Sequence, residues 1–152
     1  RALVGAAREL IPGVAVTADV IAGLPGEEEG DHQATLALVE ELGLARLHVF
    51  PYSPRPGTRT AAADTDPAVK RRRAAELRAL SDGLQDAHRR GLIGRDDAVL
   101  VEEAAADGGG LGLGRDGSPW RVAGAGGRVG DVVAARATGI LGDGRLDGRA
   151  VA

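Results

Sequence analysis

Two stretches of alternating hydrophobic and polar residues dominate the first half of the chain. Residues 14–22 place Val and Ala on one face and a mixed set that includes Asp19 on the other. Residues 45–52 repeat the pattern, with His48 and Phe50 on the mixed face. A period of two predicts a strand. A strand with one small aliphatic face and one mixed face is typical of a βα barrel, whose strands pack outward on helices and face a site inward.

Helical periodicity surrounds both predicted strands. Residues 2–10 and 27–42 carry apolar side chains at helical spacing, and Gly43 follows the second stretch as a helix-ending residue. Asp66-Pro67 is a favourable start for a third helix, which we expect to end near Arg90. Strands that alternate with helices predict an α/β fold for the first part of the chain.

The composition changes after residue 94. Residues 95–152 hold 14 of the chain's 24 glycines, with short β-like runs at 98–101, 120–123 and 132–138. Short strands separated by Gly-rich turns predict a small all-β barrel rather than further βα units. The alternative for the low-complexity stretch within it, residues 104–114, is a flexible connection. We therefore expect a domain boundary between residues 94 and 95.

Composition excludes several classes of site. The chain has 152 residues, a formal net charge of −3 and no cysteine. It therefore has no disulfide, no cysteine-ligated zinc and no cysteine-ligated iron–sulfur cluster of its own, and its charge gives no general attraction to nucleic acid. No stretch approaches the ~20 apolar residues of a membrane span, and no signal peptide is visible. We expect a cytoplasmic protein, and the absence of an initial Met suggests a fragment.

The first candidate motif runs from Thr17 to Glu27. Gly23 and Gly26 would let the backbone approach a ligand closely, and the helix expected at Glu27 offers unpaired N–H groups there. The alternative is a tight βα turn of the kind that any α/β protein contains.

The second candidate motif runs from Tyr52 to Thr58. Arg55 lies between Pro54 and Pro56, so its backbone has little freedom. An arginine presented in this way pairs with a carboxylate or a phosphate of a ligand, or forms an ion pair that fixes its own loop.

Three further features have a functional and a structural interpretation. His48 is a general base or a hydrogen-bonded wall residue, and the wall is favoured. Asp19 binds a substrate or caps a neighbouring loop. Residues 70–73, Lys-Arg-Arg-Arg, form a nucleic-acid patch or a solvated helix face, and the solvated face is favoured because four consecutive residues point around the whole helix.

Together the two motifs resemble those of the radical S-adenosylmethionine (SAM) methylthiotransferases, and the resemblance covers most of residues 1–94. Residues 48–52 are most similar to the branch that acts on N6-threonylcarbamoyladenosine next to the tRNA anticodon. The branches that act on isopentenyladenosine in tRNA and on a ribosomal protein are the alternatives.

The resemblance implies an α/β fold: residues 1–94 would be the C-terminal part of a radical SAM partial TIM-type barrel, and residues 95–152 a divergent, OB-like TRAM domain. It implies reductive cleavage of SAM by a [4Fe-4S] cluster, hydrogen abstraction from adenine C2 and delivery of a methylthio group there. The residues implied in cofactor binding are Ile21, Gly23, Gly26, Glu27, Phe50 and Tyr52. Those implied in substrate binding are Asp19, Arg55, Arg121 and Arg128. The implied partners are the tRNA anticodon stem-loop and a reductant protein, with no membrane.

The chain also departs from the family. The cluster-binding Cys-x3-Cys-x2-Cys motif is absent, so we expect no catalytic residue in this chain and no activity of the chain alone. Leu24, Glu28 and His32 replace the family's Phe, Thr and aromatic residue. Residues 95–152 carry seven Arg against nine acidic residues, whereas an RNA-binding surface is usually basic. The alternative from another class is a non-catalytic RNA-binding module.

Overall fold

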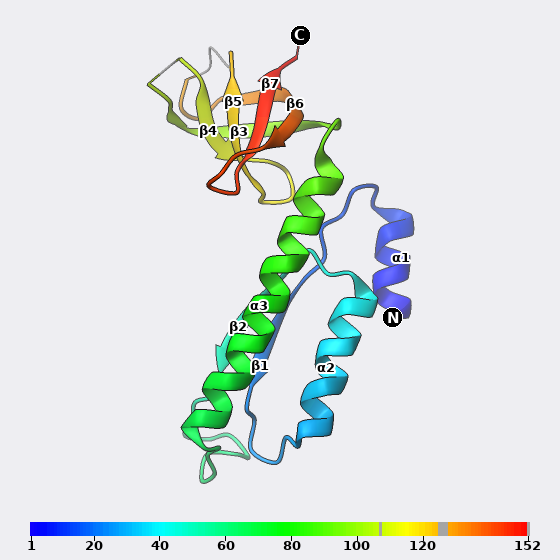
Figure 1. Ribbon diagram of the computed structural model, residues 1–152, viewed down its shortest axis with the longest axis vertical. Coiled ribbons are helices and arrows are strands. Elements are labelled where there is room, and N and C mark those ends of the chain that lie inside the picture. Colours follow the sequence, from blue (N-terminus) through cyan, green and yellow to red (C-terminus); the bar gives the residue numbers. More distant parts are fainter. Residues whose placement is uncertain (107, 125–127, 152) are drawn as a thin grey trace. The chain divides into compact units, whose positions relative to one another are not determined.

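The computed structural model describes residues 1–106, 108–124 and 128–151 (Figure 1). The chain divides into two compact units, Arg1–Gln85 and Asp86–Ala152. Each unit buries a hydrophobic cluster of its own.

The first unit alternates helices and strands, as the sequence pattern predicts. Its elements are α1 (Ala2–Leu10), β1 (Thr17–Ala22), α2 (Glu29–Leu42), β2 (Arg46–Pro51) and most of α3 (Pro67–Leu92). Strand β1 begins three residues later than predicted, and α2 two residues later. Strands β1 and β2 pair in parallel, which places Asp19 beside His48 and Ile21 beside Phe50. The α/β class is confirmed, whereas the described residues form a two-stranded sheet and do not show a partial TIM-type barrel.

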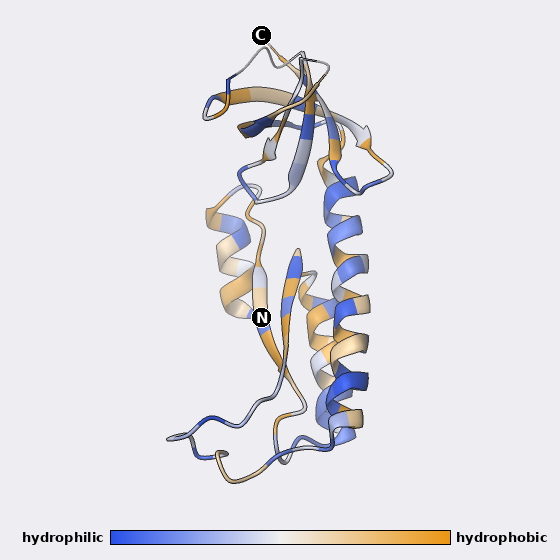
Figure 2. Ribbon diagram, turned by 90° about the vertical axis from the view of Figure 1, so that its left-hand side faces the viewer, coloured by the Kyte–Doolittle hydropathy of each residue, from blue (hydrophilic) through white to orange (hydrophobic). Residues whose placement is uncertain are grey.

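One face of this sheet carries the core of the first unit. Ala22 and Leu47 are buried against Val39 of α2 and Leu77 of α3. Figure 2 shows α3 as mainly hydrophilic, with hydrophobic positions interspersed along it. The alternation along β1 and β2 therefore has the predicted consequence: the aliphatic face packs on helices, and the mixed face remains open.

The ends of α2 explain its length. Glu28 forms a capping box with Asp31, whose carboxylate accepts the Glu28 N–H at 2.9 Å. Gly43 ends the helix with φ of 54°, a left-handed conformation that glycine adopts without strain. Three residues, Gly43 and the buried Leu44 and Ala45, thus connect the end of α2 to the start of β2.

The second unit is a closed β-barrel. Its strands are β3 (Asp96–Ala104), β4 (Gly110–Leu113), β5 (Pro119–Ala123), β6 (Val132–Ile140) and β7 (Leu146–Ala150), in the order β3-β4-β5-β7-β6 around the barrel. Strands β5 and β7 pair in parallel and the other pairs are antiparallel. The predicted small β-barrel is confirmed. Strand β4 lies inside the stretch for which a flexible connection was the alternative.

Glycines in this barrel permit close contacts that a Cβ would block. Trp120 is 1% exposed at the centre of the core. A Cβ on Gly148 would lie 2.8 Å from the Trp120 ring, and a Cβ on Gly112 would collide with the backbone carbonyl of Leu100. These glycines are therefore packing residues rather than turn residues.

The last seven residues of α3, Asp86–Leu92, belong to the second unit. Leu92 packs against the barrel core, and the Nε2 of His88 donates to the Asp116 carboxylate at 2.5 Å. The same carboxylate accepts the Ser118 hydroxyl at 2.9 Å. Within the described part of the chain, no helix is both long and apolar enough to cross a bilayer.

Candidate functional site: a cavity at the ends of two parallel strands

The open face of the β1–β2 sheet leads to a cavity of about 520 Å³ near the ends of both strands. Five residues predicted from the sequence line it: Asp19, Ile21, Phe50, Tyr52 and Arg55. Leu24, Pro51, Ser53, Thr58 and Thr60 complete the lining. The structure therefore brings the two sequence motifs together, because parallel strands end at the same edge of a sheet.

Apolar side chains form the main wall of the cavity. Ile21 and Phe50 are cross-strand neighbours, and they remain 54% and 51% exposed. Leu24, in the turn after β1, is 42% exposed. Exposed large apolar side chains that converge on a hollow are the usual lining of a small-molecule site. This wall is suited to an apolar or aromatic group of a ligand.

The loop after β2 is held by its own hydrogen bonds. The buried Tyr52 donates from its hydroxyl to the Thr60 carbonyl at 2.8 Å, and the Thr58 hydroxyl donates to the Arg55 carbonyl at 2.8 Å. Among the described residues, no carboxylate forms an ion pair with the Arg55 side chain. The loop is thus fixed without using the guanidinium, which leaves Arg55 available to a ligand.

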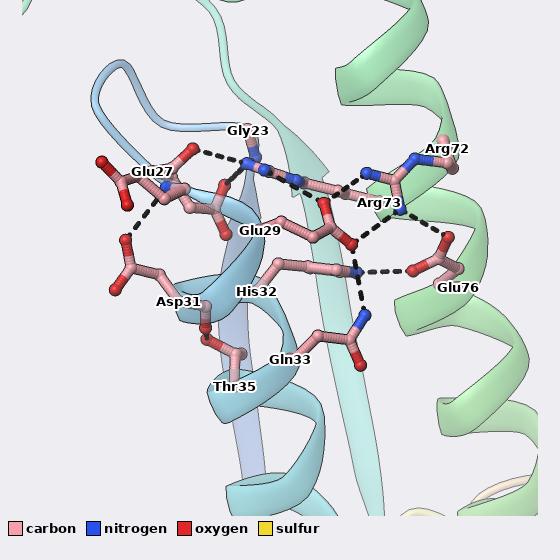
Figure 3. A network of polar contacts seen from close by, with 11 residues as sticks. Gly23, Glu27, Glu29, Asp31, His32, Gln33, Thr35, Arg72, Arg73 and Glu76 are labelled. Atoms are coloured by element: carbon pink, nitrogen blue, oxygen red, sulfur yellow. Dashed lines mark hydrogen bonds and ion pairs between the residues drawn. The ribbon is translucent and has the colours of Figure 1, made fainter.

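The turn after β1 is held by Arg73, a member of the cationic run at residues 70–73 (Figure 3). Glu27 accepts the Gly23 N–H at 2.7 Å through its carboxylate, and the same oxygen accepts Arg73 Nη1 at 2.9 Å. Arg73, 4% exposed, also donates to the Glu27 carbonyl. The interpretation of residues 70–73 as a solvated face is therefore wrong for Arg73, which is buried and links α3 to the turn.

Gly23 meets a steric requirement as well. Its φ is 76°, and a Cβ there would lie 2.6 Å from Lys70 Cγ and 3.2 Å from Lys70 Cα. The absence of a Cβ at Gly23 thus lets α3 pack closely against the turn. It would also let a ligand come close to the backbone there. Around Gly26, whose φ is 88°, a Cβ would meet nothing within 4 Å.

A second layer of charges surrounds this turn on the surface. Arg72 binds Glu29 at 2.6 Å and Glu76 at 2.9 Å. The hydrogen bond from Arg72, with help from Gln33, lowers the pKa of Glu29 to about 2. Fully buried His32 donates to Glu76 at 2.7 Å. The acidic start of α2 therefore serves as an anchor for α3, beyond its favourable interaction with the helix dipole.

The remaining predicted site residues lie apart from the cavity. Gly23, Gly26 and Glu27 belong to the turn beside it but are not part of its lining. Arg121 and Arg128 lie in the second unit, where Arg121 is 4.0 Å from Asp147. No local signal in the sequence marks Arg73, because its partner is 46 residues away.

The described residues offer no metal site. They contain no group of three or more His, Asp or Glu side chains that could hold a metal ion, and the sequence has no cysteine. A [4Fe-4S] cluster therefore finds no ligand set in the described part of the chain.

Fold and site together define an α/β unit with an apolar ligand cavity at its strand ends, followed by a small β-barrel. No family model matches the chain. Curated relatives are methylthiotransferases. A tRNA-2-methylthio-N(6)-dimethylallyladenosine synthase of Zymomonas mobilis is 43% identical over 97 residues, and one of Corynebacterium jeikeium is 41% identical over 103 residues. A ribosomal protein uS12 methylthiotransferase RimO of an Anaeromyxobacter species is 43% identical over 109 residues.

These matches cover 62%, 66% and 70% of this chain, but 22%, 20% and 23% of the respective relatives. The chain thus spans about a fifth of the length of the curated relatives it matches, and over that stretch it is homologous to methylthiotransferases. The names of these relatives do not confirm the predicted N6-threonylcarbamoyladenosine branch. They agree better with the alternatives, dimethylallyladenosine in tRNA or a ribosomal protein.

Proposed function

We propose that this chain is part of a radical SAM methylthiotransferase that adds a methylthio group to N6-dimethylallyladenosine in tRNA, the base also called isopentenyladenosine. The observation that carries the proposal is the apolar cavity at the ends of β1 and β2 in a chain homologous to methylthiotransferases. Two of the three relatives described above are named for this tRNA base, which favours it over the threonylcarbamoyl base.

The cavity fits the adenosine part of SAM. Its volume of about 520 Å³ lies within the range of small-molecule pockets, ~300–1,000 Å³. Ile21 and Leu24 would contact the purine, while the Asp19 carboxylate would accept hydrogen bonds from hydroxyl or ammonium groups. Arg55 would bind a carboxylate or phosphate of a ligand. When bound, SAM supplies the radical and methyl chemistry, with an iron–sulfur cluster held by residues outside this chain.

In this proposal the residues of the chain position the ligand and exclude water. The buried link between Arg73 and Glu27 fixes the turn that carries Leu24, so the adenosine-binding wall is formed before the ligand arrives. The chain alone would be inactive, since it lacks the cluster ligands. The β-barrel of the second unit would be the TRAM domain, and the whole enzyme would act in the cytoplasm with a reductant protein.

One relative favours a second candidate. The Anaeromyxobacter relative is named for ribosomal protein uS12, so modification of that protein is the alternative substrate for the same chemistry. A non-catalytic RNA-binding module accounts less well for the adenosine-sized cavity.

Ligand binding tests the cavity assignment directly. We expect the chain to bind S-adenosylhomocysteine in isothermal titration calorimetry. Ile21→Asp should weaken the affinity by roughly tenfold, because an apolar contact worth about 1–2 kcal/mol is replaced by a carboxylate. Leu3→Asp is the matched control, since Leu3 is 83% exposed on α1 and outside the cavity. Equal affinities for the two variants would exclude the cavity as the adenosine site.

A further inference from the structure

A second hollow of the first unit lies along the edge of β2 that does not pair with β1. This edge groove has a volume of about 320 Å³. Arg46 and His48 line it from β2, and Arg78 and Asp82 line it from α3. It is separate from the cavity described above, yet Phe50 lines both.

The charges of the edge groove favour an anion. Arg46 and Arg78 are exposed, and within the described part of the chain neither guanidinium forms an ion pair or a side-chain hydrogen bond. In contrast, Arg72 and Arg73 are satisfied by carboxylates of α2 and the preceding turn. Two permanently charged guanidinium groups against the single carboxylate of Asp82 leave this groove with an excess of positive charge.

The floor of the edge groove cannot bind an extended peptide as a further strand. Ser81, 3% exposed on α3, accepts the Leu47 N–H at 3.0 Å and donates to the Leu47 carbonyl at 3.3 Å. The N–H and C=O of one strand residue point to the same side, so Ser81 occupies the position that a neighbouring strand would take. The occupant is therefore recognised by side chains rather than by main-chain hydrogen bonds.

An exposed aromatic ring beside guanidinium groups matches the chemistry of single-stranded RNA. Phe50 is 51% exposed and offers a face on which a base can stack. Arg46 and Arg78 offer forked donors that match phosphate oxygens. We propose that the edge groove binds phosphodiester groups of an RNA substrate through Arg46, Arg78 and His48, while Phe50 stacks on a base at the entrance to the cavity. This inference rests on the proposed function, because it assumes that the substrate is an RNA.

The test measures RNA affinity as a function of salt. The probe is a fluorescein-labelled tRNA anticodon stem-loop that carries N6-dimethylallyladenosine, followed by fluorescence anisotropy. Arg46→Gln combined with Arg78→Gln should lower the affinity by roughly tenfold at low salt and reduce the slope of log K against log[salt] by about 1.5, since each lost phosphate contact removes about 0.7–0.9. Phe50→Leu should weaken binding without changing the slope, because stacking releases no counterions.

The matched control removes the same charge elsewhere. Arg71→Gln combined with Arg90→Gln lies outside both hollows, removes two exposed guanidinium groups that have no ion-pair partner among the described residues, and should leave most of the affinity intact. Arg46→Lys combined with Arg78→Lys keeps the charge and should retain most of the slope, which separates lost contacts from lost folding. An equal loss in the control pair and the groove pair would overturn the proposal.

The outcomes also separate this inference from the proposed function. In one outcome, the wild-type chain binds both the stem-loop and S-adenosylhomocysteine, and the groove variants bind RNA as well as the control variant does. Only the proposed RNA-binding role of the edge groove is then wrong. If the wild-type chain binds no RNA, both the groove and the tRNA substrate are overturned. If it instead binds purified ribosomal protein uS12, and the groove variants lose that binding, a protein substrate replaces the RNA.

Discussion

At the scale of single residues, the turn beside the cavity depends on one buried guanidinium. Arg73 donates to the carboxylate and the carbonyl of Glu27, and Glu27 in turn accepts the Gly23 N–H. The side chains of Arg73 and Glu27 are 5% and 14% exposed, so neither charge is well solvated. Removing one partner would leave the other buried and unpaired, which costs far more than breaking a surface pair.

We therefore predict different effects for two neighbouring arginines. Arg73→Leu should lower the free energy of unfolding of the first unit by about 3 kcal/mol. Arg72→Leu should cost much less, because Arg72 and its partners Glu29 and Glu76 are solvated. Urea unfolding followed by far-UV circular dichroism measures both. Similar losses for the two variants would show that the buried pair does not hold the turn.

A second residue-scale prediction concerns pH. Burial by itself raises the pKa of Asp116, but the hydrogen bonds from His88 and Ser118 outweigh burial and hold that pKa below its ordinary value. A carboxyl with a lowered pKa in the folded state contributes stability above its unfolded pKa of about 3.9, and this contribution is lost as the pH falls through the folded pKa. Thermal unfolding followed by Trp120 fluorescence should therefore show a falling melting temperature below about pH 4.

The variant Asp116→Asn isolates this contribution. It should be less stable than the wild type at neutral pH, and the difference should shrink as the solution is acidified. Asp143→Asn is the control, because Asp143 is an exposed partner of Arg145 at 3.5 Å. A difference between Asp116→Asn and wild type that does not change with pH would contradict the account.

At the scale of elements, Ser81 of α3 closes the free edge of β2. It satisfies the N–H and the carbonyl of Leu47 at a buried position, where a further strand would otherwise pair. An unsatisfied buried N–H costs about 1–3 kcal/mol. Helix α3 thus stabilises β2 by hydrogen bonding as well as by the packing of Leu77.

Ser81→Ala should therefore speed the amide exchange of Leu47. We expect faster hydrogen–deuterium exchange at this amide and a loss of about 1–2 kcal/mol in the stability of the first unit. Asp82→Ala changes the next residue on the exposed side of the helix and should leave the Leu47 exchange rate unchanged. Unchanged exchange in Ser81→Ala would show that the hydroxyl does not protect the edge.

The sequence predicts those helices and strands whose hydrophobic residues recur on one buried face. Strands β1 and β2 alternate because one face packs on helices, so their pairing and the meeting of Ile21 with Phe50 could be expected. The sequence pattern does not predict strands β4 and β7, because their glycines resemble turn signals. Gly112 and Gly148 are instead required by a neighbouring carbonyl and by Trp120, contacts that exist only after folding.

The same limit applies to the candidate site. Five predicted residues line the cavity because the two motifs lie near the ends of β1 and β2, which pair in parallel. Arg73 was assigned to a solvated face because a run of four cations indicates no direction. Its role depends on how α3 packs against the turn at Gly23. In this packing Lys70 lies against Gly23, which is a tertiary contact that the local sequence does not indicate.

At the scale of the whole molecule, the chain has two hydrophobic cores, and helix α3 contributes apolar side chains to both. The last turn of α3 packs Leu92 on the barrel and joins His88 to Asp116. A chain reduced to Asp86–Ala152 keeps these contacts, whereas one reduced to residues 95–152 loses them.

We predict that the longer of these two chains is more stable by about 2–4 kcal/mol, from the burial of Leu92 and the charged hydrogen bond of His88. Trp120 is the chain's one tryptophan and lies in the barrel core, so its fluorescence during urea unfolding reports on this unit. Equal urea midpoints for the two chains would show that α3 adds no stability to the barrel, so that the barrel would fold as a unit that begins after α3.

Mass spectrometry of tRNA nucleosides from cells that lack the gene encoding this chain would show whether the proposed enzyme methylthiolates a tRNA nucleoside. We predict loss of 2-methylthio-N6-dimethylallyladenosine and accumulation of N6-dimethylallyladenosine, with the parental levels of both restored by the intact gene. A nucleoside profile identical to that of the parent cells would contradict it, and loss of a methylthio group from ribosomal protein uS12 in the same cells would identify the alternative substrate.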